Sequence, residues 1–167
     1  MPILIRRISR TQWPTTFTTQ EDDVSADAIT NCLRTYTNAL SFWEIANNSD
    51  LIKAIIALVS GPKQEKFSGI HVVSIDTNNP LLSELTVVPS LGDTTIVPLK
   101  EDHRDITNLT YNKIGIIKKL ILEALINNRY NNYTKSEVKQ IVQDAITRGV
   151  ISISDLSPKL VETEKLK

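Results

Sequence analysis

The chain contains few of the residues from which reactive sites are built. Its 167 residues include one cysteine, two histidines and five glycines. A single cysteine, Cys32, excludes a disulfide within the chain and is typical of a reduced, cytoplasmic protein. The isolated glycines exclude a glycine-rich phosphate loop and the Gly-x-Ser-x-Gly turn of a serine hydrolase. No motif therefore assigns a catalytic activity, and no cofactor is implied.

A surplus of one charge and a long apolar run are also missing. Lys+Arg and Asp+Glu number 19 each, a net charge of +0, which disfavours a protein that depends on phosphate contacts. No stretch approaches the roughly 18 consecutive apolar residues of a membrane helix. The start of the chain reaches Arg6-Arg7 after a short apolar segment, the reverse of a secretory signal. We therefore expect a cytoplasmic protein without a membrane partner. Abundant isoleucine suggests an AT-rich genome, such as that of a bacterium or phage.

The first two thirds of the chain read as strands with one helix. Arg6 and Arg7 would fall on opposite faces of the first strand, which favours an edge position for it. Helical spacing over residues 49–60, between two strands, gives the order of a strand–helix–strand crossover. The predicted strands are residues 3–8, 40–45 and 70–75, then a loose hairpin of 85–88 with 95–97; residues 11–23 are predicted as a surface loop.

The last third reads as helices. Apolar residues at helical spacing predict one helix over about 107–127 and a second after the capping box Thr134-x-x-Glu137. Ser157-Pro158 would open a short third helix. Gly115 lies inside the first of these helices at a cost of about 1 kcal/mol relative to alanine, so we expect close packing there.

These patterns predict an α+β or three-layer α/β fold. A mixed sheet of about five strands would be covered by the crossover helix and by a C-terminal layer of two to three helices. Residues 1–104 would form the sheet with its crossover helix, and residues 105–167 the helical layer. At this length the two parts would make one domain.

A non-enzymatic, cytoplasmic protein-interaction module is the function that this composition favours. It would be an accessory, adaptor or immunity-type subunit that binds another protein, or its own copy as a homodimer. The apolar residues suffice for a core, while no acids, bases or metal ligands cluster in the sequence. The end of the chain is more apolar than a free tail requires, so the predicted partner-binding residues are Leu156, Leu160, Val161 and Leu166.

Two alternatives rest on smaller groups of residues. A metal-dependent hydrolase could use Asp76, His103 and Asp105, since carboxylates and imidazoles ligate metals and transfer protons. A nucleic-acid-associated protein could use the most basic neighbourhood of the chain, where Lys and Arg would contact phosphate and Tyr would stack on bases. That neighbourhood consists of Lys118, Lys119, Arg129, Tyr130, Tyr133, Lys135 and Lys139.

Overall fold

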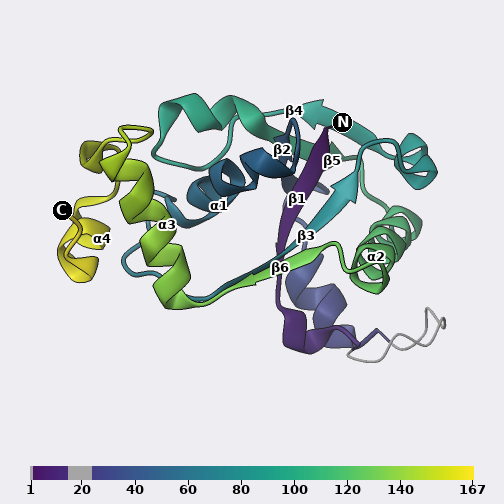
Figure 1. The fold of residues 1–167 in the computed structure, drawn as a ribbon. Helices are drawn as coiled ribbons and strands as arrows, with labels where there is room; N and C mark the ends of the chain where they lie inside the picture. The colour runs from purple at the N-terminus through teal and green to yellow at the C-terminus, as the bar shows by residue number, and fades with distance from the viewer. Residues whose placement is uncertain (1, 15–23) are drawn as a thin grey trace.

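The computed structural model describes residues 2–14 and 24–167, so most of the loop predicted over 11–23 lies outside the described residues. Within them, six strands form one sheet in the order β4-β5-β2-β1-β3-β6 (Figure 1). All neighbouring strands in this sheet are antiparallel. The strands are β1 Ile3–Ile8, β2 Leu40–Ile45, β3 Ile70–Asp76, β4 Thr86–Pro89, β5 His103–Thr107 and β6 Tyr130–Tyr133.

Four α-helices accompany the sheet in the described chain. They are α1 Leu51–Val59, α2 Tyr111–Ile126, α3 Lys135–Thr147 and α4 Pro158–Glu164. The helix starts follow from local sequence, because Thr134 and Glu137 form the predicted capping box and Ser157 caps α4 ahead of Pro158. Shorter pieces are the π-helical turn Ala28–Cys32 and the 3-10 turns Arg10–Gln12, Asn48–Asp50, Pro80–Glu84, Val97–Asp102 and Ile153–Asp155.

Both faces of the sheet are covered, because successive strand residues point to opposite sides. One face presents Leu4, Phe42 and Val73 to α2 and the π-helical turn. The other presents Ile5 and Trp43 to α1, α3 and α4. Figure 1 shows α2 on one side of the strands and α1 and α3 on the other. The α+β class is confirmed, and the C-terminal helices divide between the two faces instead of forming one layer.

The predicted strand–helix–strand crossover is present, but another strand lies between its two strands in the sheet. β2 and β3 run in the same direction on either side of α1 in the sequence, but β1 lies between them and pairs with both. The neighbours are therefore all antiparallel where the sequence suggested a mixed sheet. β1 is also central, although its two arginines predicted an edge strand.

Polar segments supply the strands that the sequence patterns did not indicate. The charged residues 103–107 form β5, which pairs with both β2 and β4, whereas β4 was predicted to pair with residues 95–97. The break predicted between the helices contains β6, which pairs with β3. A Cβ added at Gly115 would meet nothing within 4 Å, so the close packing predicted there is absent.

Candidate functional site

The residues of the metal hypothesis do not converge. Asp76 ends β3 and accepts a hydrogen bond from the N–H of Asn78 at 2.9 Å, as a turn-forming aspartate does. His103 and Asp105 lie on β5, which β2 and β1 separate from β3. No group of three or more His, Cys, Asp or Glu side chains in the described chain is arranged to hold a metal ion.

His103 is held by its own neighbours. Its ring is 7% exposed and meets Trp43 edge to face with centroids 5.0 Å apart, while Nδ1 pairs with the Ser90 hydroxyl at 2.7 Å. Burial lowers the pKa of His103 below its ordinary value, and the nearby Asp105 carboxylate only partly offsets this. Asp105 accepts a hydrogen bond from Ser41 at 3.0 Å. His103 is thus a neutral, packed histidine near pH 7.

The basic neighbourhood of the nucleic-acid hypothesis is divided by the sheet. Lys118 and Lys119 lie on α2, whereas Lys135 and Lys139 lie on α3, which covers the opposite face. Arg129 forms an ion pair with Glu123 at 2.8 Å. The two tyrosines, Tyr130 and Tyr133, are half-buried and pack against different faces of the sheet. The seven residues therefore form no continuous basic surface.

The two lysines of α3 have a common buried partner. The carboxylate of Glu164 is 4% exposed and lies 3.0 Å from the ammonium of Lys135 and 4.0 Å from that of Lys139. It also accepts a hydrogen bond from the Phe67 N–H at 2.9 Å. Burial raises the pKa of Glu164, but the hydrogen bonds and the lysine charges outweigh it and hold the pKa below its ordinary value. This ion cluster anchors α4 to the rest of the fold.

The apolar residues at the end of the chain serve its own core. Leu156, Leu160 and Leu166 are 4%, 0% and 6% exposed, and Val161 is half-buried against the same cluster. Their apolar character is accounted for by packing on the face that α1 and α3 cover. The three leucines therefore present almost no exposed surface to a partner.

Residues from two different hypotheses meet at one end of the sheet. Asp76, Arg129 and Tyr130 line a cavity of about 550 Å³, together with Ser74. The Nε of Arg129 is buried without a hydrogen-bond partner in the described structure. No sequence pattern groups these side chains, because β3 and β6 become neighbours only through the fold.

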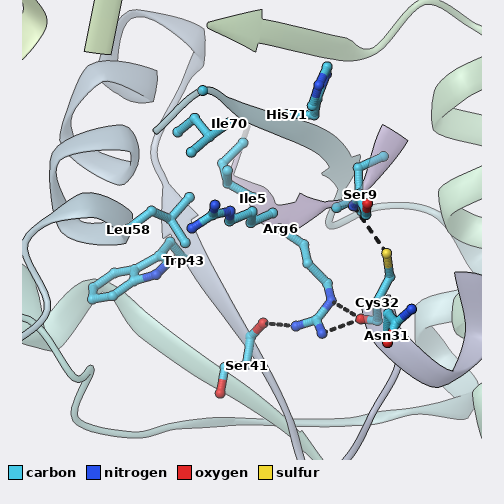
Figure 2. Close-up of a pocket in the computed structure, with 13 residues that line it drawn as sticks. Ile5, Arg6, Ser9, Asn31, Cys32, Ser41, Trp43, Leu58, Ile70 and His71 are labelled. Carbon is cyan, nitrogen blue, oxygen red and sulfur yellow. Dashed lines mark hydrogen bonds between the residues drawn. The ribbon is translucent and has the colours of Figure 1, made fainter. Parts of the chain in front are cut away.

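Sequence reasoning missed a cavity in which arginines gather. It has a volume of about 460 Å³ and lies at the end of the sheet where β1 and β2 separate (Figure 2). Arg6, Arg7 and His71 line it, and none of its described lining residues is an aspartate or glutamate. The signal for this site in the sequence is the pair of adjacent arginines in an apolar strand, a pattern that also predicts an edge strand.

Exposed apolar residues occur in β4 and in the segment that follows it. In β4, Thr86, Val87 and Pro89 are exposed, and β5 is its one neighbour among the described strands. Exposed fractions reach 77% at Leu91 and 70% at Val97, in the loop that joins β4 to β5. We call β4 with Val87, Leu91 and Val97 the β4 edge.

Comparison with known proteins adds no identification: no family model, no curated protein and no solved structure matches the chain. Among the described helices, none combines the length and the apolar character needed to cross a membrane.

Proposed function

We propose that this protein is a non-enzymatic interaction module, an accessory, adaptor or immunity-type subunit, that binds an extended segment of another protein along the β4 edge. The observation that carries the proposal is a β-branched strand paired on one side only, with exposed apolar side chains beside it. Such an edge offers unpaired N–H and C=O groups to an incoming strand. Its single cysteine suits a cytoplasmic setting, and its composition a bacterial one.

The length of β4 favours a different protein over a second copy. Four residues extend only about 13 Å, and pairing two such edges would bury far less than the roughly 1,000 Å² of a stable interface. A partner segment that continues past Pro89 could also cover Leu91 and Val97. Removing these side chains from water on binding would add to the affinity of the paired strand.

A photo-crosslinking residue tests the site in the cells that make the protein. It is placed at Val87, at Leu91 or, as a matched exposed control, at Val150, which is 60% exposed. We expect one adduct at positions 87 and 91 that is absent at 150, with the crosslink mapping to a single segment of the partner. Equal adducts at all three positions, or none, would overturn the proposal, and an adduct with a second copy would replace the assigned partner.

The mapped segment is then synthesised and added to the purified protein. We expect it to protect from hydrogen exchange those backbone amides of residues 86–88 that point away from β5, because a strand added at this edge pairs with them. Val87→Lys should weaken its binding at least about tenfold, and Val150→Lys should not. Binding that leaves the amides of β4 unprotected would contradict addition of a strand.

A further inference from the structure

The cavity between β1 and β2 exists because the two strands part. Their ladder holds from Ile3↔Ile45 to Ile5↔Trp43 and then ends. β1 continues along β3 as far as Ile8, and β2 continues along β5 as far as Leu40. From Arg6 onward, β1 therefore has no strand on its β2 side.

Arg6 bridges the gap with its guanidinium. Its Nη1 donates to the Ser41 carbonyl at 2.5 Å (Figure 2). Its Nε donates to the Cys32 carbonyl at 3.1 Å, and its Nη2 donates to the same carbonyl. These three bonds stand in for the missing ladder and leave two of the five guanidinium N–H groups for another acceptor. The guanidinium also lies over the Phe42 ring, 5.3 Å from its centroid, and neither this contact nor the neutral carbonyls supply a negative charge. Burial lowers the pKa of Arg6 to about 10, and the group remains a cation near pH 7.

The charge around this cavity is of one sign. Arg7 also lines it, is exposed and has one long hydrogen bond to Ser68 Oγ, at 3.4 Å. Neither arginine takes part in an ion pair with a described residue. A desolvated cation without a counter-ion is costly, so an anion that enters the cavity gains electrostatic free energy.

The remainder of the lining mixes polar residues, Ser9, Asn31, Ser41 and His71, with apolar ones. Half-buried Leu58 supplies the aliphatic surface and Trp43, 6% exposed, the edge of an aromatic ring, while Ile5 and Ile70 are fully buried behind them. Figure 2 shows Leu58 and Trp43 next to each other, away from the carbonyls that Arg6 binds. A ligand with both an anionic head and an apolar body would match both parts of the lining.

We propose that this cavity binds a small organic carboxylate with an apolar chain or ring. The planar guanidinium fork matches the geometry of a carboxylate, and a volume of about 460 Å³ is within the range of small-molecule sites. The site is separate from the β4 edge, because β5 and β2 lie between β4 and β1. Either proposal can therefore fail without the other.

Three probes separate the head from the body. Octanoate carries both, octan-1-ol has a body of similar size without the charge, and inorganic phosphate has charge without the body. By titration calorimetry, octanoate below its micellar concentration should bind at least about tenfold more tightly than octan-1-ol or phosphate. Equal binding of octan-1-ol would show that the cavity recognises only the apolar body. Tighter binding of phosphate would show that it recognises an inorganic anion and not a carboxylate. Either result, or no binding of octanoate, overturns the proposal.

Two arginine variants locate the contact. Arg7→Gln removes an exposed charge at the cavity and should weaken octanoate binding about tenfold or more, whereas Arg148→Gln, an exposed arginine on α3's C-terminal end, should leave it within about twofold. Equal affinities of the two variants would contradict the assignment. In the unmodified protein, octanoate should shift the backbone amide resonances of residues 5–9 and 69–71, and shifts confined to other segments would refute the site.

Discussion

Two glycines are expected to respond to alanine with opposite signs. A Cβ at Gly92 would lie 2.2 Å from Cη2 of Trp43 and 2.9 Å from two further ring atoms. The indole is 6% exposed and packs against His103, so it has little room to move. Overpacking of this kind costs about 1–3 kcal/mol. Gly115 lies in a helix with open space around it, and alanine there should stabilise the fold by about 1 kcal/mol.

Thermal unfolding followed by far-UV circular dichroism measures both effects. For a chain of this size 1 kcal/mol corresponds to about 2–4 °C, so Gly92→Ala should lower Tm by about 2–12 °C and Gly115→Ala should raise it by about 2–4 °C. The two sites share no partner, and the double variant should be additive within about 0.5 kcal/mol. An undiminished Tm for Gly92→Ala would refute the packing of the loop on Trp43. A fall for Gly115→Ala would refute the open surface of α2.

Two further variants test an ion cluster and a strained turn. The pKa of Glu164 in the folded protein is below its ordinary value. The carboxylate therefore contributes its full share to the free energy of unfolding above about pH 4.3, and this share is lost as the pH falls through the lowered pKa of the folded state. Glu164→Gln should therefore be about 1–2 kcal/mol less stable in urea at pH 7, and a difference that persists undiminished at pH 3 would contradict this. Thr37 has a φ of 54° in the turn before β2, a conformation that asparagine tolerates better than a β-branched residue. Thr37→Asn should therefore raise the free energy of unfolding by about 1 kcal/mol, with Thr35→Asn as the control. No gain in the urea midpoint would argue against strain at Thr37.

The sequence predicted those helices and strands whose apolar side chains follow a regular spacing or form a continuous run. β1, β2 and β3 are runs of buried apolar residues, and α2 and α3 have apolar stripes at helical spacing. β5 and β6 were missed because they have almost no such pattern: Ile106 is fully buried in β5, and β6 has no fully buried residue. Their stability comes from backbone pairing with strands already in place, which no local pattern encodes.

The candidate site was harder to predict than the fold. The sequence singled out histidines and aspartates by residue type, but partners such as Ser90 for His103 come from packing across the sheet. Arg6 predicted an edge strand, and only the second half of β1 has the open side of an edge strand. The strand is central up to Ile5 and has an open side from Arg6 onward, a property of strand pairing that a single sequence does not show.

The central place of β1 bears on the order in which the molecule assembles. The unit β2–α1–β3 can form early, since its parts are close along the chain, but it then holds two unsatisfied strand edges that face each other across a slot one strand wide. Only residues 3–8 fill that slot, and they must arrive from a distant stretch of the polypeptide. Until they do, the same slot would accept the equivalent segment of a neighbouring molecule, which makes exchange of the first strand the natural route by which this fold would misassemble at high concentration.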